Sequence, residues 1–280
     1  MSLRELLRVA AAQLHAAGSP SPRADAEFLL LHVVHRNSYW LRLHDEVRLT
    51  PHEQERFDEL LHRRQQGEPV AYITGERGFW SLDVKVAPGT LIPRPETEML
   101  VEFVLEKSEL TSPLAVLDLG TGSGVIALAV KKERPLAHVT AVDFSPAALE
   151  IATENAERLE LDVEFLQSDW YAALEGRRFD LLLSNPPYIA MDDAHLGQGD
   201  LRFEPISALV SGEQGLRDIR RIIEGAVQHL EPRGWLALEH GFEQGAAVRA
   251  LLEQHGFAEI ETRLDLSGHE RITLGQRHAE

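Results

Sequence analysis

The sequence predicts an α/β protein in three parts: a small N-terminal helical bundle, a β-hairpin linker, and a larger domain in which strands and helices alternate. Apolar residues recur at helical spacing in the first part, and between Trp80 and Val86 they alternate strictly with polar or short residues. From Leu114 onward, short apolar runs alternate with helical patterns. We therefore expect a bundle at residues 1–73 with a role in substrate docking, a hairpin linker at 74–95, and the larger domain at 96–280.

The amino-acid composition excludes several classes of protein and of functional site. The chain has 280 residues, of which 44% are hydrophobic and 26% charged, which is ordinary for a globular protein of two domains. It has no Cys, so disulfides, thiolate metal sites and Cys nucleophiles are excluded. The 13 His residues show no ligand spacing, so no metal site is expected. Without a membrane-length apolar run or a signal-peptide pattern, we expect a cytoplasmic protein.

The charge balance bears on possible partners. With 28 basic and 45 acidic residues, the formal net charge is −17. Proteins that bind a phosphate backbone gain affinity from Lys and Arg. The sequence therefore disfavours DNA or RNA as the main ligand, and no membrane partner is expected either.

Three helices are expected before residue 73. The first carries apolar residues from Leu3 to Leu14 on one stripe and ends at Gly18. The second begins at Ser21-Pro22, where serine caps and proline takes the first helical position. Thr50 and Glu53 form a capping box that starts the third, with Pro51 between them and a stop near Gly67.

A hairpin is expected next, with a turn at Pro88-Gly89 and a second extended run over Thr90-Leu91-Ile92. Arg94 then lies between two prolines, just before a helix with acids in its first turn. Arg94 is interpreted either as a surface residue at a well-capped helix start or as a rigid side chain that covers a cofactor.

A glycine turn follows the apolar run Leu114–Leu119 and opens a helix. Strand, glycine turn and helix in that order mark a nucleotide-type site at the carboxyl edge of a parallel sheet. The spacing departs from Gly-x-Gly-x-x-Gly and so disfavours a nicotinamide cofactor. The residues predicted to bind the cofactor here are Gly120, Thr121, Gly122, Ser123 and Gly124.

The next two strands also end in polar residues. His138–Val142 is followed by Asp143, about twenty residues after the glycine turn, where a carboxylate can accept from both ribose hydroxyls. Val163–Leu166 leads to Asp169 and Trp170. Asp169 is predicted to bind an adenine amine and Trp170 to pack against its ring, although a Trp there is as often a core residue.

The fourth strand, Phe179–Ser184, is nearly continuous in apolar residues and ends in Asn185-Pro186-Pro187-Tyr188. Two prolines fix two φ angles and remove two backbone donors, so nearby carbonyls stay free to accept. The turn presents the side-chain oxygen of Asn185, the backbone carbonyl of Pro186 and the flat ring of Tyr188. It is predicted to hold a planar group with an NH2, unless it is only a strand-ending turn. The Tyr188 ring is predicted to contribute to catalysis by packing on the plane of the bound amide.

Such a receptor suits alkylation of an amide or aromatic amine nitrogen. If Asn185 and Pro186 accept both hydrogens of the NH2, the nitrogen lone pair turns out of conjugation toward an electrophile, and no strong base is required. The expected electrophile is a sulfonium methyl. The polar segment at about 190–215 is interpreted as a lid, and alternating helices and strands complete the chain.

Several stretches of the sequence together resemble a known family. The stretches are Pro69–Glu76, Leu91–Glu98, Asp118–Gly124, Asn185–Tyr188, Gly199–Pro205 and Leu238–Gly241. They are similar to signatures of the release factor glutamine methyltransferases, within the class I S-adenosylmethionine-dependent methyltransferases. The resemblance covers essentially the whole chain, and the segment Ser267–Arg271 matches least.

The resemblance implies a fold, an activity and a site. The fold is a seven-stranded Rossmann-like methyltransferase domain after the helical bundle and hairpin. The activity is methylation of the amide nitrogen (N5) of the glutamine in the Gly-Gly-Gln motif of class 1 peptide chain release factors, with S-adenosylmethionine as cofactor. The glycine turn, Asp143, Trp170 and Asn185 match cofactor positions, and Asn185–Tyr188 match the substrate site.

Two alternatives stay open. An adenine-N6 methyltransferase of DNA or RNA uses the same four residues for an adenine amine, although the acidic charge and the lack of an added basic domain count against it. A non-catalytic adenosine-ligand binding protein is disfavoured because the predicted amide receptor is intact.

Overall fold

The computed structural model describes residues 1–111 and 113–279. Their contacts divide the chain into two compact units. The smaller unit comprises Met1–Glu76 together with Ala194–Phe203, and the larger comprises Arg77–Asp193 and Glu204–Glu280. The sequence assigned 194–203 to the larger domain, whereas in the structure this segment packs within the smaller unit.

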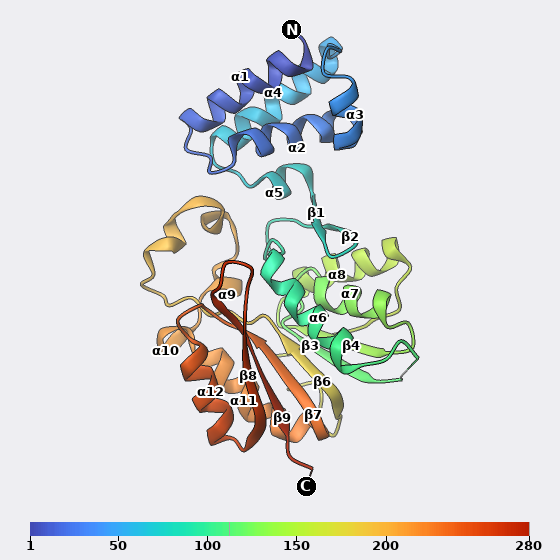
Figure 1. The fold of residues 1–280 in the computed structure, drawn as a ribbon, viewed down its shortest axis with the longest axis vertical. Helices are drawn as coiled ribbons and strands as arrows, with labels where there is room; N and C mark the ends of the chain where they lie inside the picture. Colours follow the sequence, from blue (N-terminus) through green and yellow to red (C-terminus); the bar gives the residue numbers. More distant parts are fainter. Residues whose placement is uncertain (112, 280) are drawn as a thin grey trace. The chain divides into compact units, whose positions relative to one another are not determined.

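The smaller unit is helical (Figure 1). Its elements are α1 (Leu3–Ala16), α2 (Pro22–Val34), α3 (Ser38–Leu43), α4 (Pro51–Gln65), α5 (Val70–Thr74), and the 3₁₀ turns η2 (Ala194–Gly197) and η3 (Gly199–Phe203). Capping boxes start α1 at Ser2 and α4 at Thr50, the latter as predicted. Ser21 makes no capping bond to the backbone of α2, and its hydroxyl donates to Asp25 Oδ1 instead.

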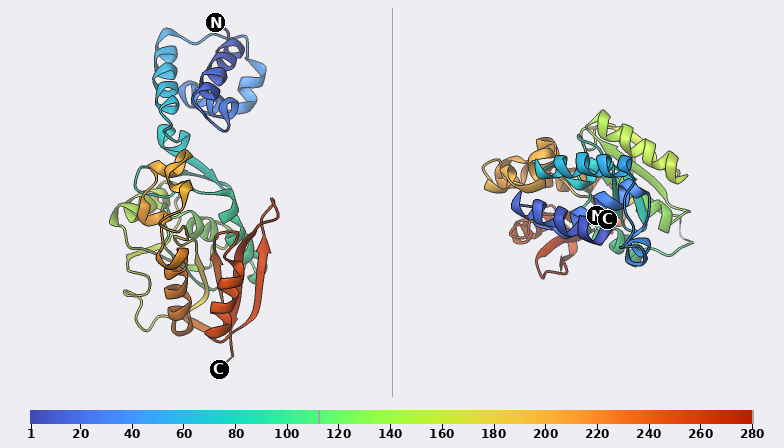
Figure 2. Two further views of the ribbon diagram at one scale, coloured as in Figure 1. Left: turned by 90° about the vertical axis from the view of Figure 1, so that its left-hand side faces the viewer. Right: turned by 90° about the horizontal axis from the view of Figure 1, so that it is seen from above.

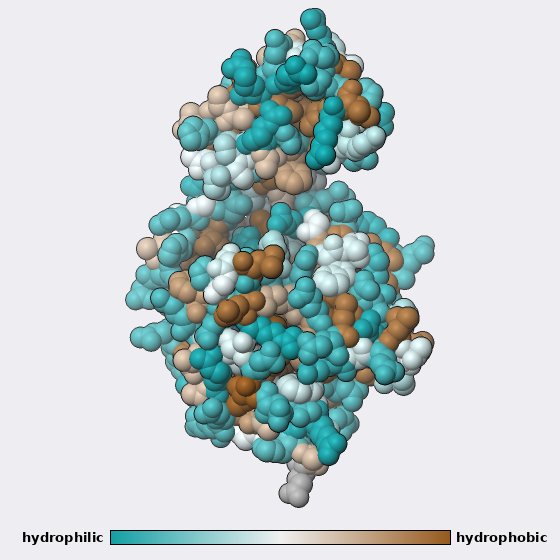
Figure 3. Space-filling view, in the orientation of Figure 1, coloured by the Kyte–Doolittle hydropathy of each residue, from teal (hydrophilic) through white to brown (hydrophobic). Residues whose placement is uncertain are grey.

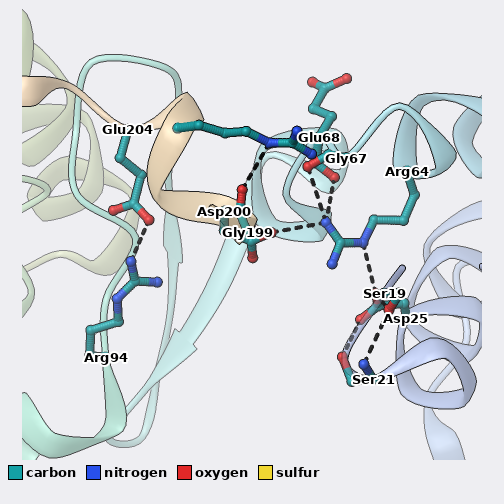
Figure 4. A network of polar contacts seen from close by, with 11 residues as sticks. Ser19, Ser21, Asp25, Arg64, Gly67, Glu68, Arg94, Gly199, Asp200 and Glu204 are labelled. Atoms are coloured by element: carbon teal, nitrogen blue, oxygen red, sulfur yellow. Dashed lines mark hydrogen bonds and ion pairs between the residues drawn. The ribbon is translucent and has the colours of Figure 1, made fainter. Parts of the chain in front are cut away.

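A buried ion pair joins the elements of this unit (Figure 4). Arg64 of α4 donates from Nε to Asp25 Oδ2 at 2.7 Å, and both side chains are less than a tenth exposed. Its Nη1 donates to Asp200 Oδ1 at 2.9 Å. The guanidinium therefore links α2, α4 and the segment that carries η3, with its charge matched by carboxylates on two sides.

The hairpin that follows α5 along the chain turns at a different place from the one predicted. Its strands are β1 (Glu76–Phe79) and β2 (Leu82–Lys85), so the turn lies at Trp80 and not at Pro88-Gly89. Trp80 has a φ of 56°, an uncommon conformation for a large side chain. Its backbone N–H donates to Glu98 Oε1 at 2.6 Å and its indole N–H to Glu133 at 2.8 Å. These bonds fix a turn that the sequence around it does not signal, and residues 90–92 form no strand.

The larger unit contains a seven-stranded sheet in the order β5-β4-β3-β6-β7-β9-β8. The strands are β3 (Ala115–Leu119), β4 (His138–Asp143), β5 (Glu164–Gln167), β6 (Phe179–Ser184), β7 (Leu230–Glu239), β8 (Phe257–Leu264) and β9 (Glu270–Arg277). The first five are parallel, and β9 pairs antiparallel with both β7 and β8. The predicted α/β fold with seven strands is confirmed.

Helices cover both faces of the sheet (Figures 1 and 2). One face carries α6 (Glu98–Lys107), α7 (Val125–Glu133) and α8 (Pro146–Leu159), and the other carries α11 (Arg217–His229) and α12 (Gly245–Gln254). Fully buried isoleucines of α11 pack with Leu117 and Leu119 of β3 in one core cluster. Because both faces are covered, the central strands read as apolar runs.

The sheet brings the ends of four strands to one edge. Leu119 of β3 lies level with Val142 of β4 and with Ser184 of β6, and Asp143 lies level with Gln167 of β5. The chain crosses from one side of β3 to the other at this point, because β4 and β6 flank it. Ligands of open parallel sheets bind at such a switch point, outside the carboxyl ends of the strands.

The remaining elements are short. They are η1 (Pro95–Thr97), α9 (Ile206–Leu209) and α10 (Gly212–Gly215), so the segment predicted as a long loop contains helical turns. Among the described residues, no helix is long and apolar enough to cross a membrane. On the face drawn in Figure 3, hydrophobic side chains occur in small groups among hydrophilic ones.

Candidate active site

A cavity of about 390 Å³ lies at the carboxyl edge of the sheet, within the larger unit. This volume falls in the range of small-molecule sites, about 300–1,000 Å³. Of the predicted site residues, those that line it are Gly120, Gly122, Asp143, Asp169, Trp170, Asn185 and Pro187. The other lining residues are Gly89, Thr90, Leu91, Val142, Phe144, Ser145, Ala148, Ser168, Pro205, Ser207, Ala208, Val210, Arg217, Asp218 and Arg221.

The glycine turn brings backbone to the cavity at Gly122. This residue has a φ of 57°, and a Cβ built on it would meet no atom within 4 Å, so its backbone borders open space. Gly124 serves packing instead, because a Cβ there would lie 3.1 Å from Ala152 Cβ. Thr121 and Ser123 are buried, and Thr121 donates to Asp118 Oδ2 at 2.6 Å. Thr121, Ser123 and Gly124 do not line the cavity.

Asp143 lies at the end of β4 and braces the turn. Its Oδ2 accepts from Gly122 N at 2.9 Å, and its Oδ1 accepts from Ser145 N at 2.8 Å. Burial raises the pKa of this carboxyl, and the backbone donors oppose that rise. Each carboxylate oxygen can accept more than one hydrogen bond, so both can still accept from ligand hydroxyls.

Trp170 and Asp169 differ in their surroundings. The Trp170 ring approaches the glycine turn, with Cζ3 3.5 Å from the position of a Cβ on Gly120. It also packs against the core cluster of β3, β6 and α11, so it serves both as a wall of the cavity and as a core residue. Asp169 is half exposed and forms an ion pair with Arg221 at 3.0 Å.

Asn185 follows the last residue of β6 and lines the cavity. The nitrogen end of its amide is hydrogen-bonded within the protein. Nδ2 donates to Thr97 Oγ1 at 3.0 Å. Thr97 in turn donates to Glu239 Oε2 at 2.7 Å. In the part of the chain that the structure describes, Asn185 Oδ1 has no protein partner. The oxygen is therefore the half of the amide that can accept from a ligand.

The residues after Asn185 are less accessible from the cavity. Pro186 is buried, and Pro187 is the one of the two prolines that lines the cavity. The Tyr188 ring packs against the core cluster, and its hydroxyl donates to Glu239 Oε1 at 3.2 Å. Burial raises the pKa of Tyr188, so the phenol stays protonated. Neither Pro186 nor Tyr188 lines the cavity, and their predicted roles in catalysis stay predictions.

Comparisons with known proteins cover both parts of the chain. A family model described as the PrmC N-terminal domain matches residues 5–75, and one described as the methyltransferase small domain matches residues 95–198. The release factor glutamine methyltransferase of Xylella fastidiosa (strain Temecula1) is 52% identical over 95% of this chain and 97% of its own length. The Pseudomonas aeruginosa protein of that name is 56% identical over 92% and 94%, and the Escherichia coli (strain K12) protein 47% over 99% of both.

This chain belongs to the release factor glutamine methyltransferase family. The resemblance predicted from the sequence is confirmed, and so is the class of enzyme, a methyltransferase.

Solved structures agree on the fold. A methyltransferase from Pyrococcus furiosus aligns with a TM-score of 0.56 at 19% identity, over 79% of this chain and 99% of its own. A T. thermophilus 16S rRNA methyltransferase, solved with AdoMet and guanosine, aligns with a TM-score of 0.54 at 20% identity, over 72% and 50%. At these identities the likeness supports the methyltransferase fold.

Two residues beside Asn185, Thr97 and Glu239, were not predicted as site residues from the sequence of this release factor glutamine methyltransferase family member. Thr97 ends η1 and Glu239 ends β7, and both are buried. Burial raises the pKa of Glu239 to about 7, against the hydrogen bonds from Thr97 and Tyr188, which lower it. The sequence contained one signal that could have identified Glu239. It is an acid at the end of the strand next to β6, and the carboxyl ends of parallel strands form the ligand site.

Arg94 does not stand free over the cavity. It forms an ion pair with Glu204, whose side chain is fully buried (Figure 4). Glu204 Oε2 also accepts from Ile92 N at 3.2 Å. Because Pro205 follows Glu204 and lines the cavity, this pair fixes one wall of the site from behind. Neither sequence interpretation of Arg94, a surface residue or a cofactor cover, describes this arrangement.

Proposed function

We propose that this chain methylates the side-chain amide nitrogen (N5) of the glutamine in the Gly-Gly-Gln motif of peptide chain release factors, with S-adenosylmethionine as methyl donor. Family membership at about half identity over nearly the full length supports the reaction. The single observation in the structure that carries it is the Asn185 amide, tied to Thr97 through its nitrogen and left with its oxygen to accept.

The residues around the cavity fit S-adenosylmethionine, which when bound supplies an activated methyl group. Asp143 offers carboxylate oxygens to hydroxyls, Trp170 offers a flat apolar wall, and the backbone at Gly120 and Gly122 permits close approach. These four residues would hold it. Asp169 would contribute less, because it is exposed and already paired with Arg221.

Asn185 acts on the glutamine amide. Its Oδ1 accepts one hydrogen of the substrate NH2, and the Pro186 carbonyl is proposed to accept the other. Holding both hydrogens out of the amide plane weakens the resonance that delocalises the nitrogen lone pair. The acceptor bond strengthens as the nitrogen gains positive charge, so it favours the transition state over the ground state.

The substrate is proposed to be a folded protein. A class 1 release factor presents its Gly-Gly-Gln motif on a loop, and residues 1–73 of this chain are proposed to dock it. The net charge of −17 weighs against DNA or RNA as the substrate. A cytoplasmic location is expected for an enzyme with this substrate.

A methyl-transfer assay tests the proposal. Purified release factor and S-adenosylmethionine are incubated with the chain, and the Gly-Gly-Gln peptide is examined by mass spectrometry for a single methyl group on glutamine. A factor with Gln replaced by Glu in that motif is the control and should gain no methyl group. Transfer to DNA or RNA adenine with none to release factor would overturn the proposal in favour of an adenine methyltransferase.

A further inference from the structure

The Asn185 amide belongs to a chain of two hydrogen bonds that run in one direction, from the Asn185 NH2 to Thr97 and from Thr97 to Glu239. We call these three side chains the relay. An ionised carboxylate can only accept, so the single hydroxyl proton of Thr97 is committed to Glu239 Oε2 at 2.7 Å. The Thr97 oxygen can then only accept, and its partner at 3.0 Å must be a donor. Of the two ends of the Asn185 amide, only the NH2 end can donate. A flipped amide would set two acceptors against each other.

We propose that Thr97 and Glu239 are positioning residues that fix the Asn185 amide with its oxygen toward the substrate. Neither residue lines the cavity, so both act through Asn185. The inference rests on the proposed function, because the Asn185 oxygen must be the acceptor of the substrate amide. It adds a cause for the orientation that the reaction needs.

The position of the relay in the fold supports this role. β6 and β7 are adjacent parallel strands, and Ser184 lies opposite Leu238. Asn185 and Glu239 are the next residues on the two strands, so they lie at the same level. Thr97 reaches them from η1, where it is 3% exposed. A buried threonine with its hydroxyl satisfied on both sides has one arrangement, whereas an exposed one would exchange its partners with water.

The charge state of Glu239 sets the direction of the relay. Protonated Glu239 gains a hydrogen and can donate to Thr97 Oγ1. The Thr97 hydroxyl is then free to donate to Asn185 Oδ1, which turns the amide and removes the acceptor from the substrate. The reversal requires the added proton on Oε2, the oxygen that faces Thr97, because a proton on Oε1 would leave Oε2 as an acceptor.

Burial is the largest influence on Glu239 and raises its pKa to about 7. Charged groups on two other elements also act on it: Arg271 of β9 favours the ionised form, and Glu96 of η1 disfavours it. The Tyr188 hydroxyl favours ionisation by donating to Oε1. The adjacent His240 is buried and its own pKa is lowered by that burial, so it adds no positive charge near neutral pH.

Nuclear magnetic resonance on the cofactor-free wild-type chain tests the relay without any substrate. The side-chain NH2 signals of Asn185, assigned by their loss in Asn185→Ala, should shift with pH at the same midpoint as the Glu239 carboxyl carbon. In Thr97→Val the carboxyl should still titrate, but the NH2 signals should no longer follow it. NH2 signals of the wild type that stay fixed while Glu239 titrates would overturn the proposal.

Kinetics provide a second test with a matched control. Thr97→Val should lower kcat about 10- to 100-fold with little change in KM for release factor, as expected for a lost transition-state alignment. Thr97→Ser keeps the hydroxyl and should restore activity to within about threefold of wild type. Thr140 of β4 is the control: it is buried and also bridges an N–H donor, from Arg177, to a carboxylate, Glu164, but lies outside the cavity lining. Thr140→Val should leave kcat unchanged.

The pH profile separates positioning from mere structural support. Wild-type kcat should fall as pH drops through about 7, because protonation of Glu239 reverses the relay. Glu239→Gln has no such ionisation and should show a flat profile across that range, whatever the level of its kcat. An identical acid limb in Glu239→Gln, or wild-type kcat in Thr97→Val, would overturn the inference. If no methyl transfer to release factor is found at all, the proposed function fails, and the resonance experiment still decides the relay.

Discussion

The hydroxyl of Thr97 donates to the carboxylate of Glu239 across 2.7 Å, although 142 positions separate the two residues in the chain. Each is the last residue of its element, η1 for Thr97 and β7 for Glu239. Their bond commits the Thr97 oxygen to accept from Asn185. The receptor predicted for the four residues from Asn185 to Tyr188 therefore depends on partners elsewhere in the chain.

Asn185→Ala should lower kcat about 100-fold or more, because it removes an acceptor whose bond strengthens in the transition state. The cofactor affinity should change much less. Single-turnover methylation of release factor, followed by mass spectrometry, measures the effect. Asn185→Asp is the finer comparison: an anionic acceptor keeps a bond to the substrate NH2, so some activity should survive. Near wild-type turnover by Asn185→Ala would return the Asn-Pro-Pro turn to a purely structural role.

Asp143→Ala should weaken S-adenosylmethionine binding by about 1.5–3 kcal/mol, because it removes charge-assisted acceptors and also the brace on Gly122. Asp169→Ala is the matched carboxylate control in the same cavity. It should cost less than about 1 kcal/mol, because Asp169 is exposed and shared with Arg221. Calorimetric titration compares the two, and equal losses would contradict the assignment of the main contact to Asp143.

Tyr188→Phe should shift the acid limb of the pH profile toward higher pH. Burial holds the pKa of Glu239 at about 7, and the Tyr188 hydroxyl is one of the groups that lower it. Without that hydrogen bond the pKa of Glu239 rises further, so ionisation requires a higher pH. Because the Tyr188 ring still packs against the core, kcat at pH 9 should stay close to wild type. An unshifted limb with reduced kcat at all pH values would contradict this account.

The local patterns at the strand ends were sufficient to predict several residues that line the candidate cavity. The glycine turn, Asp143 and Asn185 each follow an apolar run, and the rule for parallel sheets places such residues at one edge. The structure places Asp143, Asn185 and two residues of the turn, Gly120 and Gly122, in the lining of one cavity. These features were predictable because strand periodicity and the turn residues are encoded by neighbours in sequence.

Features that depend on distant partners were not predictable. Trp80 adopts a positive φ because Glu98 and Glu133 hold it, and the hairpin turn moves there from Pro88-Gly89. Residues 194–203 pack in the smaller unit because Arg64 holds Asp200, which no local pattern signals. Asp169 is drawn to Arg221 in the same way. In each case the deciding partner is a charged side chain, and the partners lie between 18 and 136 residues away along the chain.

Asp118→Asn should flatten the dependence of stability on pH. Burial raises the pKa of Asp118 to about 7, and among the described residues its Oδ1 has no hydrogen-bond partner. A raised pKa means that stability from this group is fully present below its ordinary value of 3.8 and is lost as pH rises to about 7. The loss is on the order of a few kcal/mol.

Melting temperatures of both proteins between pH 4 and pH 8 check this prediction. The difference between variant and wild type should grow in favour of the variant as pH rises, whatever constant cost the buried amide adds. Glu239→Gln should show the same trend over a similar range, because the pKa of Glu239 is raised in the same direction. Parallel pH profiles for wild type and Asp118→Asn would contradict a pKa of Asp118 raised by burial.

Arg64→Ala should destabilise the smaller unit by about 3–5 kcal/mol, because it leaves Asp25 as a buried charge without its cation. Asp200→Ala should cost less, since Asp200 is 40% exposed and the pair of Arg64 with Asp25 survives. Arg56→Ala is the surface control: its pair with Glu59 is about half exposed, and the loss should stay below about 0.5 kcal/mol.

Hydrogen exchange followed by mass spectrometry should show faster exchange in α2 and α4 for Arg64→Ala, while α11 and α12 keep wild-type protection. Because the pair of Arg64 with Asp25 is buried, added salt should alter this difference little. Unchanged protection of α2 and α4 in Arg64→Ala would show that the buried guanidinium contributes nothing to the stability of the unit.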